Sequence, residues 1–111
     1  MEITEDKRGD IFILRLTGRL DSITSGKLEE RFLALLDKGE KKVIVDFSQL
    51  DYISSAGLRV LLMVSKRLQG AKGKIVLSSM QEQVKEVFDI AGFSSIFTIF
   101  RSHEEAIRWF Q

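Results

Sequence analysis

The sequence predicts an α/β fold with a mixed sheet of four to five strands and about four helices. Strand-like and helix-like patterns alternate along most of the chain, which favours parallel strands joined by helical crossovers. The apolar runs Ile11–Leu14 and Val43–Val45 are continuous, as expected for central strands that are covered on both faces. The 111 residues contain no repeat or linker, so we expect a single domain over residues 1–111.

The first half of the chain predicts a hairpin, a helix and a central strand. Residues 2–6 and 10–17 have strand character, and a turn at Arg8-Gly9 would join them in antiparallel orientation. Residues 42–47 are predicted to form the third strand. Before it, a helix that ends at Gly39 is indicated by apolar residues at helical spacing, namely Leu28, Phe32, Leu35 and Leu36.

The second half predicts helices and strands in alternation. Residues 55–69 form the second helix, and residues 74–78 form the fourth strand. The pattern Ser-x-x-Glu at Ser79–Glu82 and again at Ser102–Glu105 predicts a capping box at the start of each of the last two helices. Residues 96–100 are predicted to form a last short strand between these helices. The core-facing residues of the helix after Ser79–Glu82 are expected to be Val84, Val87, Phe88 and Ala91. Those of the final helix are expected to be Ala106, Ile107 and Phe110.

The composition narrows the class of function. The net charge of +1, from 17 basic and 16 acidic residues, creates no field that would attract nucleic acid or an anionic membrane. The absence of cysteine excludes disulfides, thiolate catalysis and cysteine metal sites. The longest apolar run, Val60–Val64, is too short for membrane insertion, and the N-terminus does not resemble a secretory signal. We therefore expect a cytoplasmic protein whose partner is another protein.

The most informative segment is Asp51–Arg59, where an apolar strand is followed by a helix. It places Ser54 and Ser55 at the start of that helix, where unpaired N–H groups and the helix dipole favour an added phosphate. No carboxylate follows three residues after either serine, so no side chain competes with a phosphate for these groups. The simpler alternative is that one of the two serines is only the N-cap of the helix.

These residues resemble the signature of the STAS domain family, in particular of the bacterial anti-sigma-factor antagonists. The resemblance runs essentially from end to end and implies a STAS-like sandwich with its helices packed mainly on one side of the sheet. The stretches that carry it are Val45–Ser48, Tyr52-Ile53, Ser54–Leu58 and Leu16–Asp21.

The resemblance implies a switch controlled by phosphorylation. Alignment on Gly57 gives Ser55 the role of phosphate acceptor, with Ser54 as a competing acceptor. The unmodified form would bind an anti-sigma factor that is also a serine kinase, and the sigma factor would be released. Phosphorylation would end that complex, and a serine phosphatase would restore it. The implied partner-binding residues are Asp21, Ser54, Ser55, Ala56, Gly57 and Arg59.

Several alternatives stay open at this point. Ser54 stands where the family usually has an aspartate, so a non-phosphorylated STAS scaffold or regulatory subunit, in a lipid-transport assembly or a stress sensor, is a second reading. Arg59 stands where a second glycine is common, and it either pairs with the phosphate or is a solvated helix residue. Asp21 either tunes the presentation of the hydroxyl or caps the first helix. Asp46 and Asp51 are expected to be strand-end and turn residues.

The sequence does not predict an enzyme. A serine nucleophile needs a base, but the single histidine, His103, falls in the capping turn of the last helix. No metal-binding pattern and no Gly-rich phosphate loop is present. We therefore expect no catalytic residue, no metal site and no cofactor.

Overall fold

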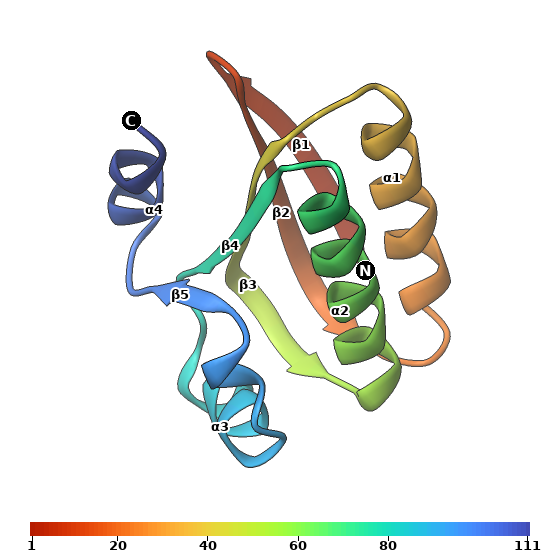
Figure 1. The fold of residues 1–111 in the computed structure, drawn as a ribbon. Helices are drawn as coiled ribbons and strands as arrows, with labels where there is room; N and C mark the ends of the chain where they lie inside the picture. The colour runs from red at the N-terminus through yellow and green to blue at the C-terminus, as the bar shows by residue number, and fades with distance from the viewer.

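The computed structural model describes residues 1–111, and it contains a five-stranded sheet in the order β1-β2-β3-β4-β5. Only β1 is antiparallel to its neighbour, so the sheet is mixed, with the hairpin at its start (Figure 1). The elements are β1 (Glu2–Arg8), β2 (Ile11–Leu20), α1 (Ser25–Asp37), β3 (Lys42–Ile53), α2 (Ser55–Gly70), β4 (Lys74–Ser78), α3 (Glu82–Ile90), the 3-10 helix η1 (Phe93–Ser95), β5 (Thr98–Phe100) and α4 (His103–Phe110).

The helices cover the two faces of the sheet unequally. Helices α1, α2 and α3 pack on one face around a core of 21 buried residues, whereas α4 packs on the other face around a cluster of six. Side chains alternate along β3, so that Val43 and Val45 join the larger core and Ile44 joins the smaller one. The predicted fold class is confirmed, including central strands covered on both faces. None of the helices has both the length and the apolar character that crossing a membrane requires.

The central strands are longer than predicted. Strand β3 continues to Ile53, six residues beyond the predicted end at Phe47, because it pairs in parallel with β2 as far as the Leu20–Ile53 pair. Register shifts interrupt this pairing, and the exposed residues between Ser48 and Ile53 gave the stretch the appearance of a loop. The hairpin turn lies at Gly9-Asp10, where Gly9 adopts a φ of +62°.

One of the two predicted capping boxes is wrong. Ser79 lies outside α3, with a φ of +63°, and its N–H donates to the carbonyl of Phe100 in β5. The N-cap of α3 is Gln81, which makes no side-chain capping bond, and Ala91 is exposed at the other end of the helix. At α4 the serine half of the predicted box is confirmed, since Ser102 Oγ accepts the N–H of Glu105 at 3.2 Å.

Candidate functional site

The candidate site lies where β2 and β3 end and α2 begins, at the lower end of the view in Figure 1. Leu20 and Ile53 are paired at the ends of their strands, and the N–H of Ser54 donates to the carbonyl of Leu20 at 2.8 Å. This bond joins the start of α2 to the end of β2. The residues that follow β2 and the residues that open α2 therefore share one edge of the molecule.

The structure separates the roles of the two serines. Ser54 is the half-buried N-cap, and its Oγ accepts the N–H of Gly57 at 3.3 Å. Ser55 is the first residue of α2 and is exposed, and no acidic residue occupies the first turn. The N–H groups of Ser55 and Ala56 have no acceptor within the helix, because helical bonds begin one turn later. A phosphate on Ser55 would lie beside these groups at the positive end of the helix dipole.

Substitution by alanine should distinguish the cap from the exposed hydroxyl. Ser54→Ala removes the capping bond and is expected to lower the free energy of unfolding by about 1 kcal/mol. Ser55→Ala removes an exposed hydroxyl and should change that free energy by less than about 0.5 kcal/mol. Urea denaturation of both variants measures the difference, and equal losses would contradict the assignment of Ser54 as the cap.

The next residues of α2 differ in their exposure to solvent. Gly57 is buried, and a Cβ added there would lie 2.7 Å from Leu20 Cγ, so the absence of a side chain at Gly57 permits close packing against the end of β2. Arg59 is exposed one turn after Ser55, and with Ala56 it borders a shallow hollow that also includes Glu29 of α1. Of these three predicted binding residues, Ala56 and Arg59 are accessible from solvent.

Asp21 lies in the turn between β2 and α1 and organises that turn. Its Oδ1 accepts the N–H groups of Ile23 and Thr24, each at 3.0 Å. The Thr24 N–H is the main cause that lowers the pKa of the Asp21 carboxyl. The helix itself begins at Ser25, after the N-cap residue Thr24. Asp21 thus stabilises the turn before α1, close to the start of α2.

The other acidic candidates and the histidine lie elsewhere. Burial would raise the pKa of the Asp46 carboxyl, but the Ser48 N–H and the Arg15 guanidinium, 2.9 Å away, together hold that pKa below its usual value. Asp46 is buried inside β3 rather than at a strand end, and Asp51 is an exposed residue of the same strand rather than a turn residue, so both expectations were wrong. His103 begins α4, on the face of the sheet opposite to α2. It is not placed to activate a serine at the start of α2.

Sequence reasoning missed one prominent residue beside this site. Ile23 lies in the Asp21 turn with 87% of its side chain exposed. Tyr52 of β3 is 39% exposed, and the Arg19 guanidinium lies 4.1 Å from the centroid of its ring. The available signal was a single isoleucine inside a polar stretch, between Asp21-Ser22 and Thr24. The surroundings of Ser55 therefore combine polar and apolar exposed groups.

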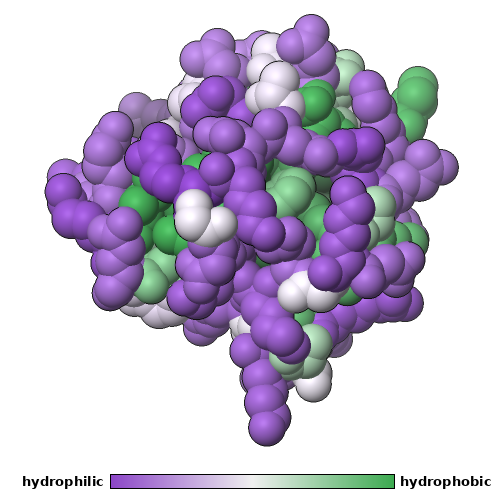
Figure 2. Space-filling model, turned by 90° about the horizontal axis from the view of Figure 1, so that it is seen from above, coloured by the Kyte–Doolittle hydropathy of each residue, from purple (hydrophilic) through white to green (hydrophobic).

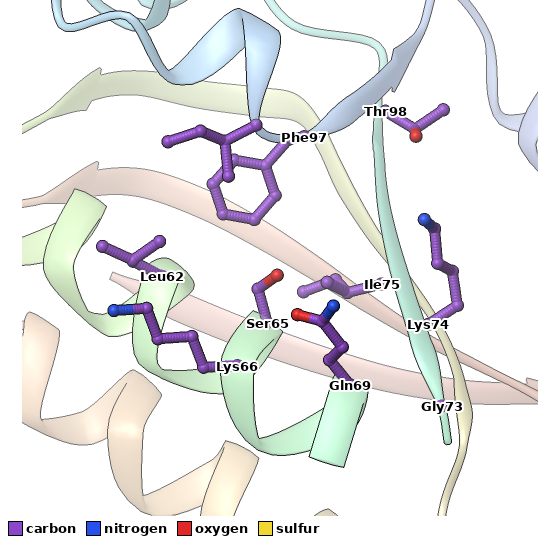
Figure 3. A pocket seen from close by; sticks show the side chains of 10 residues that line it. Leu62, Ser65, Lys66, Gln69, Gly73, Lys74, Ile75, Phe97 and Thr98 are labelled. Carbon is purple, nitrogen blue, oxygen red and sulfur yellow. The ribbon is translucent and has the colours of Figure 1, made fainter. Parts of the chain in front are cut away.

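The pocket in Figure 3 lies away from the two serines. It has a volume of about 280 Å³ and lies between the second half of α2 and strands β4 and β5, with Ser65, Gln69 and Phe97 among its lining residues. Figure 2 shows the end of the molecule opposite to the start of α2, where hydrophilic residues predominate and hydrophobic ones form small separate areas. Ser55 instead lies on an open surface, which suits contact with a protein better than enclosure of a small molecule.

Comparisons with known proteins agree with this geometry. The model of the STAS domain family matches residues 2–106. BtrV of Bordetella bronchiseptica, a candidate anti-sigma factor antagonist, is 44% identical over 111 residues, which cover 100% of this chain and 96% of BtrV. A candidate anti-sigma factor antagonist from Thermotoga maritima has a similar crystal structure, with a TM-score of 0.91, 22% identity, and coverage of 96% of this chain and 92% of that one. The Bacillus cell fate determinant SpoIIAA in its phosphorylated form gives a TM-score of 0.78 and 20% identity over 99% of this chain and 100% of that one.

Proposed function

The chain belongs to the STAS domain family, and from this membership we propose that it is an anti-sigma-factor antagonist whose binding is switched off by phosphorylation of Ser55. In its unmodified form it binds an anti-sigma factor that is also a serine kinase, and the sigma factor is released. The kinase uses ATP to modify Ser55, and a serine phosphatase restores the binding form. The protein acts in the cytoplasm as a binding module and not as an enzyme.

One observation supports this proposal above all others. The hydroxyl of Ser55 is exposed on the first residue of α2, beside N–H groups that the helix leaves unpaired. The neighbouring hydroxyl of Ser54 is engaged in capping, which favours Ser55 as the acceptor. This arrangement occurs in a chain that is 44% identical over its full length to a candidate antagonist.

An energetic argument supports a position of Ser55 inside the binding surface. A phosphate adds roughly −1.5 to −2 charges, and at a helix N-terminus it stabilises the domain by about 0.3–1 kcal/mol. That gain does not oppose binding, and a hundredfold loss of affinity requires about 2.8 kcal/mol. The opposing free energy must arise at the interface, where a like charge or a desolvated phosphate costs several kcal/mol. The partner therefore covers the hydroxyl in the complex.

Phosphate mapping tests the proposal directly. Protein isolated from its native cells is analysed by intact mass, before and after phosphatase treatment, and the modified peptide is sequenced. We expect phosphate on Ser55, its loss in Ser55→Ala, and its retention in Ser54→Ala. Phosphate on Ser54 would contradict the assignment of the acceptor. Persistent absence of phosphate under varied growth conditions would favour a STAS scaffold, the reading that Ser54 in the place of the family's aspartate keeps open.

A further inference from the structure

The Asp21 turn, residues 21–24, holds an isoleucine in solvent beside the start of α2. Ile23 is 87% exposed, as is Ile90 at the end of α3, and these are the two most exposed large hydrophobic residues of the chain. A single exposed isoleucine is common on protein surfaces and carries no meaning alone. What distinguishes Ile23 is the structure that holds it and the site next to it.

The turn is fixed on both sides of Ile23 by hydrogen bonds. Asp21 Oδ1 accepts the N–H of Ile23 itself and that of Thr24, each at 3.0 Å. The Thr24 hydroxyl accepts the N–H of Asp21 at 2.9 Å and donates to the carbonyl of Arg19 at 2.8 Å. Ile23 is therefore presented on an ordered backbone, which lowers the entropy cost of burying it in a complex.

The turn also lies beside the proposed phosphorylation site. Asp21 follows Leu20, whose carbonyl accepts the N–H of Ser54 at 2.8 Å. Tyr52, which pairs with Arg19 across the two strands, adds exposed aromatic surface at the same edge. Tyrosine is one of the residue types that dominate protein interfaces, and an aliphatic or aromatic side chain that fills a pocket of the partner is a common anchor.

We propose that Ile23 is the apolar anchor through which this protein binds its anti-sigma factor, with Tyr52 adding aromatic surface to the same interface, and that the partner receives Ile23 in an apolar pocket next to the surface that covers Ser55. This inference rests on the proposed function. It assigns two roles to neighbouring residues: Ile23 provides affinity, and Ser55 controls it. It also gives Asp21 a positioning role, since Asp21 sets the direction in which Ile23 points.

A matched pair of variants tests the anchor. Ile23→Ser and Ile90→Ser remove the same side chain with the same exposure from two different elements. We expect Ile23→Ser to raise the Kd for the anti-sigma factor at least about tenfold, and Ile90→Ser to leave it unchanged. Isothermal titration calorimetry measures the Kd, and thermal unfolding of each variant should remain that of the parent, because neither side chain is packed.

The outcomes separate this inference from the proposed function. If the parent protein binds and Ile23→Ser binds equally well, the anchor is rejected and the antagonist function stands. Equal losses in Ile23→Ser and Ile90→Ser also reject an anchor specific to the Asp21 turn. If the parent protein neither binds the anti-sigma factor nor accepts phosphate from it, the proposed function fails, and the anchor fails with it.

Discussion

Ser55→Asp is expected to weaken binding to the anti-sigma factor about a hundredfold, whereas Ser55→Ala should keep the affinity of the unmodified protein. The aspartate places a negative charge where the partner covers the surface, and like charges brought together at an interface cost several kcal/mol. A hundredfold change corresponds to about 2.8 kcal/mol. The alanine variant removes only an exposed hydroxyl, so its interface remains uncharged at this point.

Calorimetric titration of both variants measures this difference. Ser65→Asp is a suitable control, because it adds the same charge to a half-buried serine of the same helix, in the pocket of Figure 3 and away from the start of α2. Binding by the control should match that of the parent protein. The loss in Ser55→Asp should become smaller at high salt, since ions screen repulsion between partly exposed charges. Equal affinities of Ser55→Asp and Ser55→Ala would reject the switch.

Gly57→Ala is expected to destabilise the fold by about 1–3 kcal/mol, although alanine is the better helix former. An added Cβ would lie 2.7 Å and 2.9 Å from atoms of the Leu20 side chain and 3.0 Å from Ile53 Cγ1. Leu20 and Ile53 are buried at the paired ends of β2 and β3, so they have little room to move. Relief of the contact would push the start of α2 away from the sheet and disturb the candidate site.

Gly26→Ala provides the comparison for this prediction. Gly26 is also an early residue of its helix, α1, but nothing lies within 4 Å of a Cβ added there. That variant should gain up to about 1 kcal/mol, the usual advantage of alanine over glycine in a helix. Chemical denaturation gives both free energies of unfolding. A stabilisation of Gly57→Ala similar to that of Gly26→Ala would show that the contact with Leu20 is easily relieved.

The two Ser-x-x-Glu patterns show which structural features the local sequence predicts correctly and which it does not. The same pattern predicts a capping box at Ser79 and at Ser102, but only Ser102 caps its helix. At Ser79 the backbone N–H is instead bound to Phe100, a residue of β5 that is distant in sequence. A local sequence pattern indicates which hydrogen bond a side chain is able to make. Whether that bond forms depends on the backbone conformation, which at Ser79 is fixed by pairing with β5.

The sequence by itself determined the order of strands and helices, the faces that they bury, and the serine at the start of α2, because these depend on residue spacing and on helix termini. Only the tertiary structure decided that β3 continues to Ile53, that Gly57 is buried against Leu20, and that the end of β2, just before the Asp21 turn, is bonded to the start of α2. These features depend on strand pairing and on contacts between residues far apart in the chain. A local sequence pattern does not predict such contacts, because they form only when the elements pack together.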